Sequence, residues 1–206
     1  MKLKVCGMRD PNNIRQVLDL NPDYMGFIFF EKSPRNVGEQ LDEGLLKAFP
    51  ESTQKVGVFV NANLDFVKEK VAKYSLDLVQ LHGDESVDYV AELYAVGIEV
   101  MKVFSVGESF DFAQLRQYNP FVSFFLFDTK GEQRGGTGKT FDWEILKGYD
   151  LEVPFFLSGG IDLENIEALD KLKGLKLHAI DVNSRFELEP ALKDVDGLSE
   201  LKAKLA

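Results

Sequence analysis

The sequence has little of the chemistry that disulfides and metal sites require. It contains one cysteine and two histidines in 206 residues. A single cysteine excludes an intrachain disulfide framework and a zinc site made of several cysteines, and two histidines exclude a histidine-rich metal centre. Positive charge is also scarce, because 34 acidic residues outnumber 24 basic ones and give a net charge of −10. Such a surface repels phosphate backbones, so no nucleic-acid partner is expected.

Long apolar runs are missing as well. No stretch reaches the length of a transmembrane helix, and the first residues, MKLKVCGM, lack the apolar core of a signal peptide. These absences predict a cytoplasmic protein with no membrane partner. Hydrophobic residues make up 45% of the chain, enough to bury a substantial core, and no linker or low-complexity segment divides it. We therefore expect one domain over residues 1–206.

Short apolar runs alternate with helical patterns along the whole chain. Eight such pairs follow one another at roughly the 20–30-residue spacing of βα repeats. The expected strands are residues 3–6, 24–30, 55–60, 76–81, 98–104, 122–127, 154–157 and 177–182. The expected helices include residues 11–20, 38–49, 64–74 and 192–205. The alternation implies a parallel sheet, and eight units predict closure into a (β/α)8 TIM barrel, with an open doubly wound sheet as the main alternative.

The most informative stretch is FFLFDTKGEQRGGTGKTFDW, residues 124–143. An apolar run typical of a buried strand ends at Asp128, and a loop with several glycines follows. Ligands of α/β folds bind at the carboxyl ends of the strands, so this pattern predicts a site for a charged small molecule. The letters GTGKT resemble the end of a nucleotide-binding P-loop, but Gln133 stands where that motif requires its first glycine.

Other polar or reactive side chains also fall where the expected strands end. They are Cys6, His82, Ser158, Asp181 and Asn183. In a barrel these positions meet at one rim, although they are far apart in sequence. Each has a structural explanation when taken alone, since a lone cysteine is commonly a small buried side chain and a histidine beside a turn can cap it. Their combination with Asp128 favours a functional site.

The loops after the last two expected strands favour phosphate binding. Barrels commonly bind phosphate there through backbone N–H groups. The two loops are SGGI at 158–161 and NSRF at 183–186. Gly159 and Gly160 allow close approach of the backbone, and a helix that starts nearby adds its positive dipole end. The alternative is that these glycines only form a tight turn.

Several segments, taken in order, carry a resemblance to a known family. They are VCGM (5–8), GFIFFEKSPRNV (26–37), VGVFVN (56–61), VQLHGDES (79–86), FDTKG followed by GGTGKTFDW (127–143), and LSGGI (157–161). In this order, over almost the entire chain, they resemble phosphoribosylanthranilate isomerase. The resemblance implies a (β/α)8 barrel that needs no cofactor and no metal. It also implies conversion of N-(5-phosphoribosyl)anthranilate to the ring-opened carboxyphenylamino-deoxyribulose phosphate, an Amadori rearrangement in tryptophan biosynthesis. The expected partner is a phosphorylated small-molecule substrate, and the protein is expected to be a monomer or a homodimer.

The resemblance also implies roles for individual residues. Asp128 matches the general acid that protonates the ring oxygen, and Cys6 matches the base that removes the C2 hydrogen of the resulting imine. These roles need a thiolate on Cys6 and a proton on Asp128, states that a dry and polarised barrel mouth can favour. Arg35 matches the residue expected near the anthranilate carboxylate. His82 and Asp181 match substrate-binding positions at the rim.

A phosphate site follows from the same resemblance. Its expected members are Gly136, Gly159, Gly160, Asn183, Ser184 and Arg185. The family usually has DVSSG after the last strand, whereas this chain has DVNSR at 181–185, so Arg185 replaces a glycine. We expect Arg185 either to bind phosphate or to reach solvent and pair with a surface carboxylate such as Glu187.

Strand parity adds one expectation about the barrel interior. Lys4 and Cys6 are two residues apart on the first strand, so both side chains are predicted to point into the barrel. A lysine buried there requires a carboxylate partner, and Asp181 on the neighbouring last strand is the candidate.

Two other functions fit the same barrel. One is a different phosphosugar isomerase or epimerase, against which Cys6 and Arg35 count, because they suit an aromatic carboxylate substrate. The other is a non-catalytic phosphosugar-binding or assembly protein, for which the pair of Cys6 and Asp128 has no need.

Overall fold

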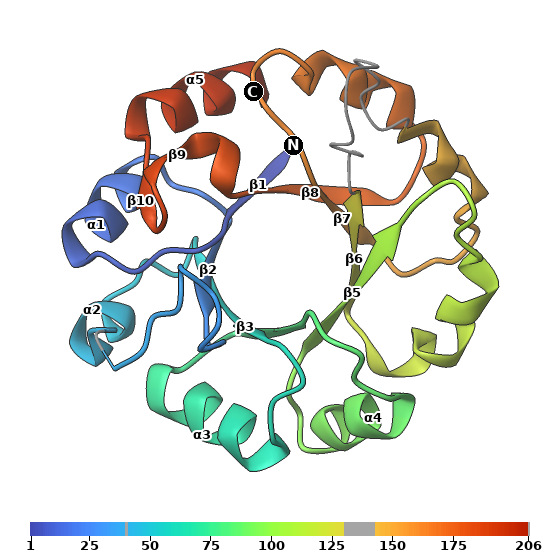
Figure 1. Cartoon of the computed structure of the whole chain (residues 1–206), viewed down its shortest axis with the longest axis horizontal. Helices are drawn as coiled ribbons and strands as arrows, with labels where there is room; N and C mark the ends of the chain where they lie inside the picture. The colour runs from blue at the N-terminus through green and yellow to red at the C-terminus, as the bar shows by residue number, and fades with distance from the viewer. Residues whose placement is uncertain (40, 130–142, 206) are drawn as a thin grey trace.

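The computed structural model closes the chain into a barrel of eight parallel strands (Figure 1). It describes residues 1–39, 41–129 and 143–205. The strands of the barrel are β1 (Lys2–Val5), β2 (Tyr24–Ile28), β3 (Gln54–Phe59), β4 (Leu78–Leu81), β5 (Val100–Val106), β6 (Phe124–Thr129), β7 (Phe155–Ser158) and β8 (Leu177–Val182). Each strand pairs with the next, and β8 closes the ring on β1 with Asp181 opposite Lys4. The predicted (β/α)8 barrel is confirmed, and the open sheet is wrong.

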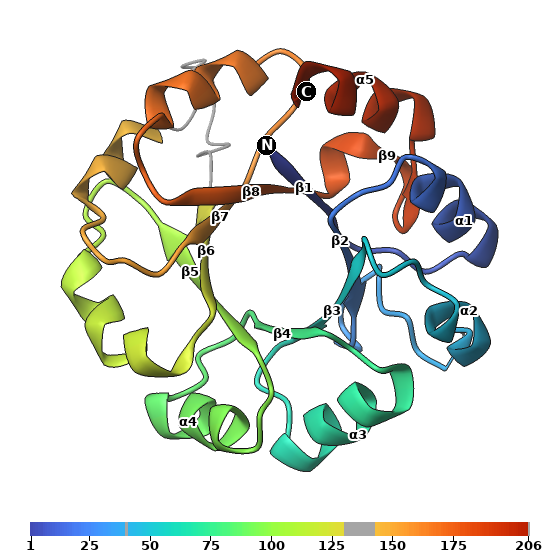
Figure 2. The same cartoon turned by 180° about the vertical axis from the view of Figure 1, so that it is seen from behind.

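Helices surround the strands on the outside, as both views show (Figures 1 and 2). The α-helices are α1 (Pro11–Asp19), α2 (Glu43–Lys47), α3 (Leu64–Tyr74), α4 (Val87–Ala95) and α5 (Val195–Leu205). The crossovers after β5, β6 and β7 contain 3₁₀ helices, namely η1 (Phe112–Gln117), η2 (Asn119–Phe121), η3 (Trp143–Gly148) and η4 (Ile166–Leu172). After β8 come a 3₁₀ turn, η5 (Ser184–Phe186), and a small hairpin of β9 (Glu187–Glu189) and β10 (Leu192–Lys193). None of the described helices is both long and apolar enough to cross a membrane.

Short polar side chains fix where the helices begin. Asp10 accepts a hydrogen bond from Asn13 N, and Pro11 occupies the first turn of α1, as the sequence predicts. The helix expected over residues 38–49 is shorter, because Asp42 caps it by accepting from Leu45 N. The helix expected from residue 192 begins instead at Val195, because residues 192–193 pair with β9.

Alternation along each strand separates two apolar layers and positions the site. The layer inside the barrel consists of Tyr24, Val56, Leu78, Met101, Val103, Leu126, Phe156 and Ala179. On β6, Leu126 packs in this inner layer, whereas Phe125 and Phe127 pack in the outer one, under the helices. Two residues beyond Leu126, Asp128 therefore turns inward at the carboxyl end of the barrel. By the same parity Asp181 follows Ala179 inward on β8.

Candidate active site

Asp128 and His82 form one side of the barrel mouth. Asp128 is the last but one residue of β6 and lies opposite Ser105 of β5 and Ser158 of β7. His82 follows β4, where its backbone N–H donates to Phe59 O at 2.8 Å. The His82 Nε2 and Asp128 Oδ2 atoms are 3.7 Å apart, and their side chains are 40% and 22% exposed. The structure thus brings the expected acid and histidine together where a ligand can reach both.

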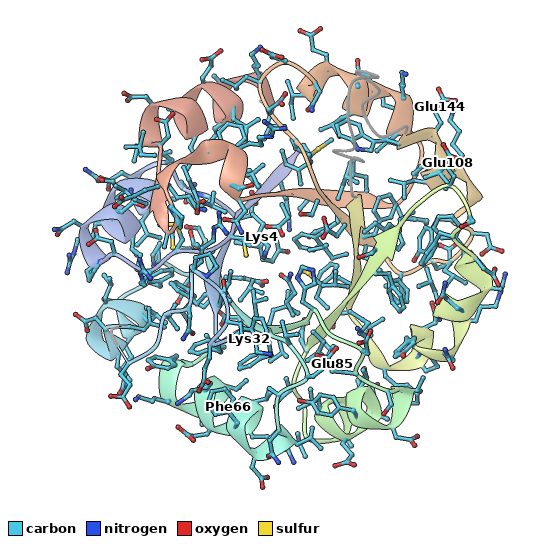
Figure 3. The ribbon with its side chains drawn as sticks, viewed as in Figure 1. Lys4, Lys32, Phe66, Glu85, Glu108 and Glu144 are labelled. Carbon is cyan, nitrogen blue, oxygen red and sulfur yellow. The ribbon has the colours of Figure 1, made fainter. Side chains whose placement is uncertain are left out.

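The interior of the barrel beneath the mouth contains a buried ion pair. Lys4 Nζ donates to Asp181 Oδ1 at 2.8 Å, and their side chains are 0% and 6% exposed. Figure 3 shows Lys4 inside the ring of strands. Burial acts to lower the pKa of Lys4, but the Asp181 carboxylate and the Cys6 thiol outweigh it and leave that pKa above its ordinary value. The predicted pair is confirmed.

Cys6 lies directly after β1, where its backbone N–H donates to Val182 O at 2.9 Å. Its side chain is buried, and burial raises the pKa of the thiol. Lys4 and Lys193 act to lower that pKa and Asp181 acts to raise it, but burial dominates. Burial thus favours the neutral thiol of Cys6, whereas the base role requires a thiolate. The positive charges of Lys4 and Lys193 partly offset the effect of burial on the pKa of the thiol.

Gly26 makes room for this thiol, a role that sequence reasoning missed. A Cβ atom placed on Gly26 of β2 would lie 2.8 Å from Cys6 Sγ and 3.1 Å from Cys6 Cα. No side chain fits there without moving the cysteine. The signal was present in the sequence, since a glycine inside a buried strand commonly marks a close approach.

Arg35 lies in a network whose other charged members were not predicted as site residues. Its Nε donates to both carboxylate oxygens of Glu187 at 2.9 and 3.0 Å, and its Nη2 donates to Oε2 at 2.6 Å. Lys193 Nζ donates to Glu187 Oε1 at 2.5 Å and to Asn183 Oδ1 at 2.7 Å. Glu187 is thus a buried partner of Arg35 and Lys193, and its expected pairing with Arg185 at the surface is wrong. Burial acts to raise the pKa of Glu187, but the Arg35 and Lys193 hydrogen bonds outweigh it and lower that pKa.

The structure places the expected phosphate loops on neighbouring strands. Ser158 at the end of β7 lies opposite Asp181 of β8, so residues 158–160 and 183–185 follow adjacent strand ends. Gly159 and Gly160 have φ angles of 100° and 67°, which side-chain-bearing residues rarely adopt. Ser184 and Arg185 are exposed. Gly136, the remaining expected member, lies outside the described residues.

A second buried ion pair holds the loop that carries His82. Lys102 Nζ donates to Glu85 Oε2 at 3.1 Å and to Gly83 O at 2.7 Å. Glu85 Oε1 in turn accepts from Asn61 N at 2.9 Å, which ties the loop after β3 to the loop after β4. Glu85 is labelled in Figure 3. Sequence reasoning did not assign these residues, because Lys102 lies inside an apolar strand pattern. In the part of the chain that the structure describes, no three His, Cys, Asp or Glu side chains are arranged to hold a metal ion.

The chain is thus a (β/α)8 barrel with a polar site at the carboxyl ends of its strands, the end at which such barrels act. This site contains a thiol, a carboxylate and several cations. Residues 3–202 match the model of the N-(5'-phosphoribosyl)anthranilate (PRA) isomerase family. The chain belongs to this family.

Individual relatives cover nearly the whole chain. The N-(5'-phosphoribosyl)anthranilate isomerase of Parabacteroides distasonis is 46% identical over 199 residues, which are 96% of this chain and 90% of that protein. The crystal structure of the Thermotoga maritima phosphoribosyl anthranilate isomerase matches with a TM-score of 0.87 and 30% identity, covering 100% of both chains. Another phosphoribosyl anthranilate isomerase was crystallised in complex with reduced 1-(o-carboxyphenylamino)-1-deoxyribulose 5-phosphate. It matches with a TM-score of 0.85 and 27% identity, also over 100% of both chains.

Proposed function

We propose that this protein converts N-(5-phosphoribosyl)anthranilate to 1-(2-carboxyphenylamino)-1-deoxyribulose 5-phosphate, the isomerase step of tryptophan biosynthesis. Family membership supports the reaction, and the complex of a relative with a reduced form of the product supports a phosphorylated small-molecule ligand. The observation that carries the proposal for this chain is its single cysteine, set at the end of β1 with Lys4 and Lys193 acting on the thiol.

In the proposed first step, Asp128 gives its proton to the ring oxygen of the aminofuranose. The C1–O bond then breaks, the oxygen becomes a hydroxyl, and the anilino nitrogen forms an imine with C1. Asp128 suits this role because it is partly exposed at the end of β6. His82, 3.7 Å from the carboxylate, is placed to contact substrate and acid together.

In the second step, Cys6 removes the C2 hydrogen and the electron pair moves to form an enolamine, which tautomerises to the ketone. The base must be deprotonated for this step, and burial works against that state. Lys4 and Lys193 favour the thiolate, and the positive charge of a protonated imine next to the cysteine favours it further. Because two side chains perform both proton transfers, the proposed reaction uses no metal and no organic cofactor.

The remaining expected residues bind the substrate in this proposal. Arg35 uses two of its five N–H donors on Glu187, one on Nε and one on Nη2. Its other N–H groups stay available for the anthranilate carboxylate. The backbone donors of 158–161 and 183–185 bind the phosphate, supplemented by Arg185. Asp181 contacts the substrate from the floor of the mouth. Residues 1–206 act as one cytoplasmic catalytic domain, as a monomer or a homodimer.

The test is loss of the fluorescence of freshly made N-(5-phosphoribosyl)anthranilate on addition of the purified protein. Cys6→Ser and Asp128→Asn should each lower kcat by roughly a hundredfold to ten-thousandfold, the range for removing a proton-transfer group. Asp150→Asn is a matched control, because Asp150 is 58% exposed in a surface pair with Arg116. Circular dichroism checks that each variant folds. Near-normal turnover in Cys6→Ser or Asp128→Asn removes that residue from the mechanism, and an inactive wild type refutes the proposed function.

A further inference from the structure

The hairpin of β9 and β10 holds two buried charges in a fixed position. Glu187 and Lys193 face each other across the hairpin, and Ala191 N donates to Glu187 Oε1 at 3.2 Å. The Asn13 side chain on α1 binds both the N–H and the carbonyl of Lys193, at 2.7 and 3.0 Å. Asn13 itself is buried. The Lys193 end of the hairpin is therefore anchored to α1, and Glu187 is held through its ion pair with Lys193.

The Glu187 carboxylate is shared between two cations from different parts of the chain. Arg35, from the loop after β2, binds it through Nε and Nη2, and Lys193 binds it through Nζ. The Glu187 and Lys193 side chains are 4% and 0% exposed. Buried ionic groups contribute little net stability relative to an apolar replacement. Folding alone is therefore a weak reason to place these charges there.

The network converges on the residue next to the candidate base. A Cβ atom on Gly7 would lie 2.8 Å from Arg35 Cδ and 2.8 Å from Asn183 Oδ1. Asn183 Oδ1 is the atom that accepts from Lys193 Nζ. Gly7 follows Cys6 directly. Arg35 and the Asn183 side chain that accepts from Lys193 therefore both pack against the backbone beside the thiol.

We propose that Glu187 and Lys193 are positioning residues for the reaction: Glu187 holds Arg35 at the mouth for the substrate carboxylate, and Lys193 supplies a fixed positive charge that favours the Cys6 thiolate. The inference rests on the proposed function and names residues that act through Arg35 and Cys6 without reacting themselves. It predicts two separable effects, one on substrate binding and one on the thiol.

The effect on the thiol follows from the charges around it. The groups that act on Cys6 are Lys4 of β1, Asp181 of β8, Lys193 of β10, and Arg35 after β2. Lys193→Met removes one cation and leaves the Glu187 carboxylate in place, so the thiolate becomes less favourable. Glu187→Gln combined with Lys193→Met also removes the carboxylate, but Glu187 is not among the groups that act on Cys6, so the thiolate should stay about as unfavourable as in Lys193→Met.

Alkylation by iodoacetamide measures this directly, because the chain has a single cysteine. The midpoint of the rate against pH should rise in Lys193→Met by on the order of one pH unit. It should stay raised in the double variant, because the carboxylate removed there is not among the groups that act on the thiol. Lys102→Met is the matched control, since Lys102 is also a buried lysine paired with a glutamate, and Cys6 is not among the groups that shift its pKa. The alkylation rate on the alkaline plateau measures how accessible the Cys6 thiol is. A change in accessibility can therefore be distinguished from a change in the midpoint. A midpoint in Lys193→Met equal to that of Lys102→Met overturns the role of Lys193.

A double-mutant cycle tests the role of Glu187. Glu187→Gln should raise KM for N-(5-phosphoribosyl)anthranilate more than it lowers kcat, and Glu187→Asp should restore part of the loss. If Glu187 acts through Arg35, adding Glu187→Gln to Arg35→Ala should change kcat/KM by less than about twofold. Fully additive losses overturn this role. An inactive wild type would refute the proposed function and with it the role of Glu187 toward substrate, while the alkylation experiment would still decide the role of Lys193.

Discussion

Asp181→Asn should destabilise the protein strongly, by an amount that decreases as pH rises. Lys4 has no exposed surface, and its Nζ donates to Asp181 Oδ1 at 2.8 Å. Its other electrostatic partner is the Cys6 thiol. Asparagine keeps the shape of the partner but removes its charge. In the variant, Lys4 must therefore stay charged without a counterion or give up its proton when the protein folds.

Release of the Lys4 proton sets an upper limit to the free energy of unfolding that Asp181→Asn can lose. Releasing a proton costs about 1.4 kcal/mol for each pH unit between the solution pH and the ordinary lysine pKa of about 10.4. At about pH 7 the limit is therefore about 5 kcal/mol. Removing one partner of a buried ion pair usually costs about 3–5 kcal/mol, so the expected loss falls in the same range.

The same reasoning fixes the sign of the pH dependence. In the variant the folded state holds Lys4 neutral while the unfolded state holds it charged, so the unfolded state binds one more proton. The stability of the variant then rises by about 1.4 kcal/mol per pH unit on going from about pH 7 to about pH 9. In the wild type the pKa of Lys4 is raised. Its contribution there is fully present below the unfolded pKa and is lost only as pH rises through the folded one. The difference in stability between the two proteins should therefore shrink across this range.

Urea denaturation followed by circular dichroism measures this difference, with Glu85→Gln as the control. The lysine that pairs with Glu85 keeps carbonyl acceptors at Leu81, Gly83 and Val103, at 3.4, 2.7 and 3.3 Å. The loss of stability in Glu85→Gln should therefore be smaller, about 1–3 kcal/mol, and should depend less on pH. A loss in Asp181→Asn that does not change with pH, or equals that of Glu85→Gln, would refute the reasoning.

Three further predictions concern the mouth. Because burial raises the pKa of Cys6, the rate of its alkylation by iodoacetamide should keep rising with pH beyond the ordinary thiol value of about 8.5, and a plateau beginning near neutral pH would contradict this. Gly26→Ala should lower kcat by roughly tenfold or more, because its Cβ meets Cys6 Sγ at 2.8 Å and a displaced base transfers protons poorly. Gly107→Ala, where nothing lies within 4 Å, should leave kcat unchanged. Arg185→Gly should weaken competitive inhibition by inorganic phosphate and raise KM with a smaller effect on kcat. An unchanged phosphate inhibition constant would assign phosphate binding to the backbone alone.

Strand parity explains how much of the site could be predicted from the sequence. Alternation along a strand and the rule that barrels act at strand ends depend only on local pattern. They were enough to direct Lys4 inward, to pair it with Asp181, and to place Asp128 at the mouth. They hold here because every strand runs parallel and is covered on its outer face, so the same parity applies around the ring.

Contacts between distant residues that sit on no strand could not be predicted in this way. Arg35 and Glu187 are 152 positions apart, and the hairpin that presents Glu187 lies in a segment whose pattern suggested a helix from residue 192. A charged residue in an acidic chain is commonly solvated, so the sequence alone favoured the surface for Glu187. Only the fold shows that two cations enclose it.

The environment of Cys6 combines two opposing requirements of a catalytic base. A strong base has a high pKa, and burial provides that. A usable base must also lose its proton at the working pH, and here Lys4 and Lys193 act in that direction. Each lysine is tethered to a carboxylate, Asp181 or Glu187, which favours its charged form, although burial still leaves the pKa of Lys193 below its ordinary value. In the proposed reaction the protonated imine appears beside the thiol only after the ring has opened. The positive charge of this imine therefore adds to that of the two lysines only when the thiolate is needed to deprotonate C2. For this reason Cys6 can serve as the base even though burial favours its neutral thiol.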